Sequence, residues 1–122
     1  MSPAMPPENT MEPTLDTVIA KILQVFPGRN VEEILSSLAR YGTETYEQER
    51  CRIYLEILKL CQQENLSDPS SYIEAAKQDY RDVLAWAEYP NQMKFGPTNN
   101  PDESTRLRKQ DEEQYQAWLN KK

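Results

Sequence analysis

The stretch Ile53-Tyr-Leu-Glu-Ile-Leu-Lys-Leu-Cys61 decides the fold of this chain. Apolar side chains occupy all of its positions except Glu56 and Lys59, so they cover two faces of any helix that the stretch forms. A helix that is apolar over most of its circumference must be packed by several neighbours. The pattern therefore predicts a central helix. We expect it to begin at Thr45, which forms a capping-box pattern with Gln48, and to end at about Gln62.

Amphipathic patterns on both sides of this stretch predict the neighbouring helices. Apolar residues recur at helical spacing from Leu15 to Phe26 and again from Val31 to Ala39. A further helix is expected from Asp68 to about Tyr89, stopped by Pro90. Each predicted helix begins at a residue that favours an N-cap: Thr14, Asn30, Thr45 and Asp68. No strand pattern occurs, so we predict an all-α fold with a small four-helix domain over residues 14–90.

The ends of the chain differ from this domain in composition. Residues 1–13 are rich in proline and predict a flexible N-terminal tail, and residues 91–100 predict a linker. Asn100-Pro101 then marks the start of a helix, which we expect to form a C-terminal helical arm over residues 101–120. The apolar residues of this arm are few, so docking should help it to form.

Charge and hydropathy restrict the surroundings in which the protein works. The net charge is −6, and residues 64–90 hold six acidic and two basic residues, a net of −4. An acidic domain repels phosphate backbones, which argues against nucleic-acid binding. No apolar run approaches the ~18–20 residues of a membrane span, and no signal peptide is recognisable. We therefore expect a cytoplasmic protein that does not bind a membrane.

The two cysteines, Cys51 and Cys61, fall on the predicted central helix. Ten residues at the helical rise separate them by about 15 Å, which is too far for a disulfide. We predict that both are reduced residues of the core.

The composition argues against catalysis. Histidine is absent, which removes the commonest general base and metal ligand, and the three glycines are too scattered for a phosphate-binding loop. We predict no catalytic residue, no cofactor and no metal site. Asp79 and Asp82 are the best chemical candidates, and we expect them to pair across the bundle with cations rather than to share a divalent ion. The cations in question are Arg40, Arg50 and Arg52.

Aromatic residues supply the candidate binding surfaces. On a continuous helix, Trp86 lies beside Tyr72 and away from the apolar stripe. Either Trp86 packs under another segment, for which Tyr89, Met93 and Phe95 are the obvious candidates, or it anchors a partner protein. Tyr115, Trp118 and Leu119 form a second apolar group at the end of the arm. They can dock on their own domain, insert into another protein, or exchange with a second copy in a homodimer.

Two families resemble parts of this sequence. The Val25-Phe26-Pro27 turn, residues 30–38 and the Glu56–Leu60 run resemble a CUE or UBA-like three-helix module. That resemblance implies ubiquitin recognition through Phe26, Pro27, Leu58 and Leu60. Residues 22–90, ending in the Asp79–Pro90 segment, are similar to small bacterial all-helical proteins of unassigned activity. This second likeness implies a bacterial intracellular domain and supplies no function.

These observations favour a non-catalytic protein–protein interaction module, such as an adaptor, an assembly factor or a regulatory subunit. Its expected partner-binding residues are Tyr72, Trp86, Tyr115, Trp118 and Leu119. Two alternatives remain at this point. One is the ubiquitin-type recognition module, and the other is a nucleic-acid-associated regulator that uses the basic cluster Arg106, Arg108 and Lys109.

Overall fold

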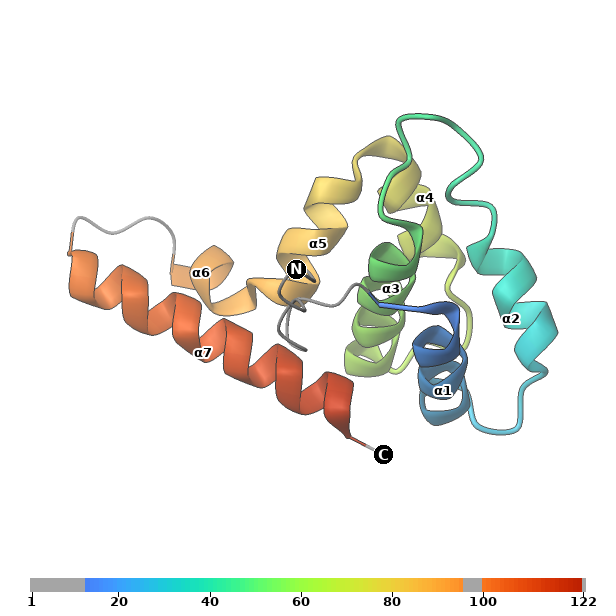
Figure 1. The fold of residues 1–122 in the computed structure, drawn as a ribbon, viewed down its shortest axis with the longest axis horizontal. Coiled ribbons are helices and arrows are strands. Elements are labelled where there is room, and N and C mark those ends of the chain that lie inside the picture. Colours follow the sequence, from blue (N-terminus) through green and yellow to red (C-terminus); the bar gives the residue numbers. More distant parts are fainter. Residues whose placement is uncertain (1–12, 96–99, 122) are drawn as a thin grey trace, which may run out of the picture.

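The computed structural model describes residues 13–95 and 100–121, apart from the side chain of Phe95. Within those ranges it holds seven α-helices and no strand, which confirms the all-α prediction. The helices are α1 (Leu15–Val25), α2 (Val31–Leu38), α3 (Arg50–Glu64), α4 (Ser70–Gln78), α5 (Tyr80–Glu88), α6 (Pro90–Phe95) and α7 (Pro101–Asn120). Helices α1 to α5 form a bundle. The C-terminal half of α7 lies against this bundle, and its first half extends away from it beside α6 (Figure 1).

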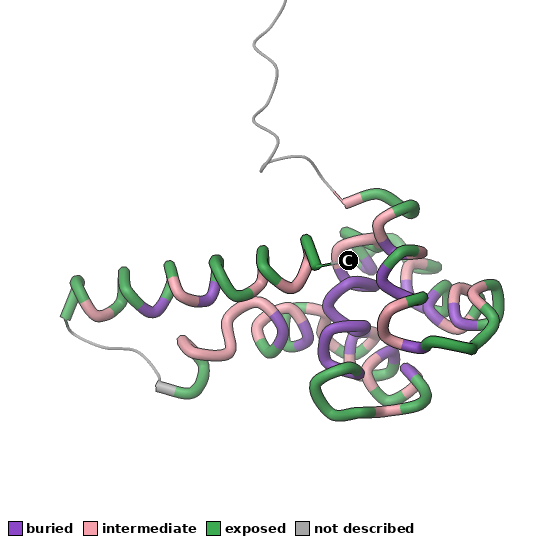
Figure 2. The backbone as a smooth tube through the Cα atoms, turned by 90° about the horizontal axis from the view of Figure 1, so that it is seen from below, coloured by how far each residue is buried: buried purple, intermediate pink, exposed green. Residues whose placement is uncertain are grey.

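Helix α3 is the centre of the bundle, as its composition predicts. All nine residues from Ile53 to Cys61 are buried, and α1, α4 and α5 pack around them. Figure 2 shows this concentration of buried residues, in contrast to the mostly exposed surface of α7. Because both polar residues of the stretch are buried with the apolar ones, the core contains the ionisable groups of Glu56 and Lys59.

The first two helices begin at the predicted caps. The Thr14 side chain accepts a hydrogen bond from the Thr17 amide, and the Asn30 side chain accepts one from the Glu33 amide. The apolar stripe of α1 is narrower than expected, because Leu15 and Leu23 remain 49% and 56% exposed.

The predicted start of the central helix at Thr45 is wrong, because α3 begins only at Arg50. The preceding residues form a loop around the Glu47 carboxylate. Its Oε1 accepts hydrogen bonds from three backbone amides, those of Gly42, Thr43 and Glu44, and its Oε2 pairs with Lys77 Nζ at 3.0 Å. This carboxylate gives three backbone amides of the loop an acceptor, which favours the loop over a helix that begins at Thr45.

The predicted fourth helix is two helices. The chain turns at Asp79, whose backbone is extended, and the Asp79 side chain caps α5 by accepting from the Arg81 amide at 3.0 Å. Asp is a strong N-cap residue, and that preference was the available sequence signal for the break.

The residues expected to form a linker contain a helix instead. Pro90 occupies the first position of α6, where a proline's missing amide hydrogen costs nothing. Residues 96–99 of the expected linker, and residues 1–12 of the expected N-terminal tail, lie outside the described residues. None of the helices in residues 13–95 and 100–121 is long and apolar enough to cross a membrane.

Candidate functional site

Tyr72 and Trp86 form an aromatic pair where α4 and α5 meet. Their ring centroids are 6.3 Å apart at an interplanar angle of 66°, an edge-to-face contact. Tyr72 packs against the core, whereas Trp86 remains 40% exposed. The predicted neighbourhood of these two residues is therefore confirmed, although the helix that was expected to carry both is interrupted between them.

The surroundings of Trp86 are partly acidic. Asp82 lies one helical turn before Trp86 on α5 and is exposed. Met93, which was expected to help cover Trp86, is itself 54% exposed. We call Tyr72, Asp82 and Trp86 the aromatic surface.

The expected pairing of Asp79 across the bundle is wrong. Asp79 pairs with Arg81, two residues along the chain, at 2.9 Å. Hydrogen bonds from the Arg81 side chain and backbone lower the pKa of Asp79. The cations that were expected to face it have other partners: Arg52 binds Glu49 and Glu88, and Arg40 binds Glu74. Among the described residues no group of three potential metal ligands converges.

The aromatic residues of the arm dock on their own domain. The Tyr115 hydroxyl donates to Glu56 Oε1 at 2.5 Å, and Trp118 Nε1 donates to Gln62 Oε1 at 2.6 Å. Leu119 and Trp118 are partly buried against the core, and the Tyr115 and Trp118 ring centroids lie 5.8 Å apart. In this conformation α7 directs these three side chains towards its own bundle.

Lys21 holds the last turn of α7 from the opposite end of the sequence. This lysine is buried, and its Nζ donates to the backbone carbonyls of Trp118 and Lys121. The same Nζ lies 4.5 Å from the centroid of the Trp118 ring. Cations are stabilising at the negative end of a helix. Burial, followed by the charge of Lys121, lowers the pKa of Lys21.

Asp111 fixes the other half of α7 to α6. Its carboxylate accepts from the backbone amides of Asn91 and Gln92 at 2.9 and 3.1 Å, and from both of their side-chain amides. Burial disfavours the charged form of Asp111, but these hydrogen bonds outweigh that effect and lower its pKa. Asp111 is therefore the N-cap of α6, supplied from another helix.

Glu56 is the least satisfied polar group of the core. It is fully buried, and its Oε2 is a buried atom without a hydrogen-bond partner. Arg52 holds Glu88 through bonds of 2.7 and 2.8 Å, and the negative charge of Glu88 acts on Glu56. Burial and then the charge of Glu88 raise the pKa of Glu56 well above its usual range.

Sequence reasoning missed these buried polar residues. Glu56 and Lys59 had a visible signal, because they interrupt a stretch whose other members are all apolar. Lys21 had a similar signal, because it interrupts the apolar run from Val18 to Leu23. Asp111 had none, since its neighbours along the chain are polar.

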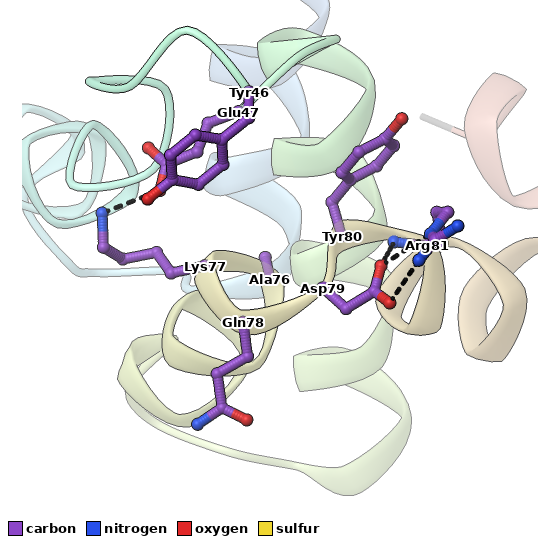
Figure 3. Close-up of a pocket in the computed structure, with 8 residues that line it drawn as sticks. All are labelled: Tyr46, Glu47, Ala76, Lys77, Gln78, Asp79, Tyr80 and Arg81. Atoms are coloured by element: carbon purple, nitrogen blue, oxygen red, sulfur yellow. Dashed lines mark hydrogen bonds and ion pairs between the residues drawn. The ribbon is translucent and has the colours of Figure 1, made fainter.

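A surface pocket of about 290 Å³ lies beside the break between α4 and α5. Figure 3 shows its lining, in which the charged groups already pair with one another: Glu47 with Lys77, and Asp79 with Arg81. Tyr46 and Tyr80 supply its aromatic walls. The pocket thus offers aromatic surface to a ligand, whereas its four charged residues Glu47, Lys77, Asp79 and Arg81 are already paired with one another.

The residues singled out by resemblance occupy other places. Phe26, Leu58 and Leu60 are buried in the core, and only Pro27 is exposed, so this conformation presents no Phe-Pro and leucine surface to ubiquitin. In the basic cluster, Arg106 pairs with Glu103, while Arg108 and Lys109 are exposed.

The prediction that both cysteines are buried is confirmed only in part. Both are free thiols, but Cys51 is half-buried and Cys61 fully buried. Burial raises the pKa of Cys61 to about 12, so its reactive thiolate is scarce at neutral pH.

No family model matches this chain, and neither a curated protein nor a solved structure is detectably similar to it.

Proposed function

We propose that this protein works without catalysis, by binding another protein through the aromatic surface of α4 and α5. This role is that of an adaptor, an assembly factor or a regulatory subunit. The observation that carries the proposal is the 40% exposure of Trp86 beside Tyr72. Tryptophan and tyrosine are the residues most often found at the energetic centre of protein interfaces.

The chemistry of the aromatic surface restricts the partner. Tyr72 packs against the core and supports Trp86 from one side, so the indole is partly ordered before it binds. Ordering a side chain in advance reduces the entropy lost on association. Asp82 lies exposed on the same face as Trp86. The complementary surface is an apolar pocket with a lysine or arginine at its rim.

The arm contributes less to this proposal than its sequence suggests. Tyr115, Trp118 and Leu119 contact their own domain and are partly buried there. A partner would have to displace α7 to reach them, whereas it can reach Trp86 directly. We therefore assign partner binding to the aromatic surface first.

The test compares two variants that each remove one exposed apolar side chain. Trp86→Ala removes the proposed anchor, and Leu23→Ala removes an exposed leucine from α1 and serves as the control. The full-length wild type and both variants are immobilised and incubated with a lysate of the source organism's cells. We expect a protein that is retained by the wild type and by Leu23→Ala and is lost from Trp86→Ala.

Titration of that protein should then show a loss of about 2 kcal/mol, roughly 30-fold in Kd, for Trp86→Ala. Circular dichroism checks that both variants fold. If Trp86→Ala retains every protein that the wild type retains, the aromatic surface is not the binding site.

A further inference from the structure

Glu56 stands at the point where α7 meets the centre of the bundle. Its Oε1 accepts from the Tyr115 hydroxyl at 2.5 Å, and its Oε2 has no hydrogen-bond partner although the residue is fully buried. An ionised carboxylate needs several donors to remain in such a place. One phenol is too little, so the geometry requires the neutral acid.

Charged and titratable groups from three helices surround this carboxyl group. The negative charge of Glu88 on α5 disfavours its ionisation, and the cations on its own helix α3 favour it. Tyr115 on α7 keeps its proton, because burial, followed by the influence of Glu56, raises the pKa of its hydroxyl. The groups that act on Glu56 are Arg52, Lys59, Glu88 and Tyr115, and Asp111 acts on Lys59 in turn.

We propose that Glu56 is a proton-dependent latch for the arm: its protonated form holds the C-terminal half of α7 on α3, and its ionisation releases that half. In the release step the O–H bond of the Glu56 carboxyl breaks, the proton passes to solvent water or hydroxide, and the electron pair remains on the carboxylate. The Tyr115 O–H bond stays intact. Water then hydrates the carboxylate once α7 has left.

The direction of the pH dependence follows from the two environments of Glu56. With α7 docked, the carboxyl group is buried and its pKa lies above the ordinary value of 4.5 that a solvated carboxyl approaches. The docked state therefore holds the proton more tightly, and docking weakens as pH rises above that ordinary value towards the raised one. Below the ordinary value the latch is fully closed.

Release of α7 would uncover the side chains that the arm now directs inwards. Tyr115, Trp118 and Leu119 would then be available to a partner, and so would the bundle surface around Gln62. The latch thus controls a second surface, and it does not depend on binding at the aromatic surface.

The test follows the environment of Trp118 during a pH titration of the full chain. All proteins carry Trp86→Phe, which leaves Trp118 as the only tryptophan. We expect its fluorescence to shift to the red and its quenching by acrylamide to increase as pH rises, while circular dichroism shows that the bundle stays folded. Glu56→Gln imitates the neutral acid and should abolish this transition.

Two further variants separate the latch from other titrations. Glu113→Gln removes an exposed carboxylate from α7 and should leave the transition unchanged. Tyr115→Phe removes the hydrogen bond and should expose Trp118 already at low pH. If the transition persists in Glu56→Gln, another group such as Lys21 causes it and the proposal is wrong. A Trp118 signal that does not change with pH, or one that changes only when the whole fold is lost, also overturns it.

Discussion

The buried carboxyl groups of Glu47 and Glu56 have pKa values shifted in opposite directions, and that of Glu47 is lowered. Its side chain is 1% exposed, and burial alone would raise its pKa. The hydrogen bond from Lys77 and those from three backbone amides outweigh burial and lower the pKa from 4.5 to about 2. A lowered pKa stabilises the folded state above the unfolded value, and this contribution is lost as pH falls from 4.5 through about 2.

Glu47→Gln should therefore lower the free energy of unfolding at neutral pH by about 1–3 kcal/mol, because backbone donors and Lys77 lose a charged acceptor. The same variant should flatten the loss of stability between pH 4.5 and about 2. Urea unfolding at a series of pH values measures both effects. Glu44→Gln changes an exposed carboxylate of the same loop and should behave like the wild type. Equal effects of the two substitutions would show that the loop does not depend on Glu47.

At the scale of single residues, a contact can be predicted only where its partner is close in the sequence. The caps at Thr14 and Asn30 were predictable, because a cap depends on residues only three positions away. The pairing of Glu47 with Lys77 and the contacts of Lys21 with α7 were not, since those partners lie 30 and about 100 residues away. A sequence indicates that a group is polar, but only the packing decides whether it is buried.

At the scale of elements, α6 shows why propensity alone is insufficient. It has six residues, a length at which an isolated helix is unstable in water. It forms where Asp111 of α7 accepts the first free amides of α6, at Asn91 and Gln92. The sequence predicted the arm because Asn100-Pro101 marks its start, but it could not predict that the arm caps the preceding segment.

Asp111→Ala should loosen α6 without unfolding the bundle. Loss of a helix cap costs about 0.5–2 kcal/mol, which corresponds to roughly 2- to 30-fold faster hydrogen exchange of the α6 amides. Hydrogen–deuterium exchange followed by mass spectrometry measures the exchange rate of each helix. The amides of α3 should stay protected from exchange. Glu112→Ala, at the exposed neighbouring position, is the matched control. Exchange that rises equally in α3 and α6 would mean that Asp111 supports the entire fold instead.

At the scale of the whole molecule, the contact of Lys21 with α7 joins the two ends of the described chain. Lys21 Nζ donates to the carbonyls of Trp118 and Lys121, which are 97 and 100 residues further along. The bundle was predictable from its apolar periodicity, whereas this closure is made by the buried Lys21 together with Gln24, whose side chain also donates to the Lys121 carbonyl. Because the closure links α1 to α7, we expect the arm and the bundle to unfold together in the wild type.

Lys21→Met should break this cooperativity. Methionine keeps the apolar part of the side chain but donates no hydrogen bond, so α7 loses about 1–3 kcal/mol of docking free energy through its last turn. With Trp86→Phe in each chain, Trp118 fluorescence reports on the arm and circular dichroism on the bundle. At mildly acidic pH the two urea transitions should coincide in the wild type, whereas Lys21→Met should shift the Trp118 transition to lower urea. Lys109→Met on the exposed face of α7 should leave them coincident. Coincident transitions in Lys21→Met would show that the apolar contacts of Trp118 and Leu119 suffice to hold the arm.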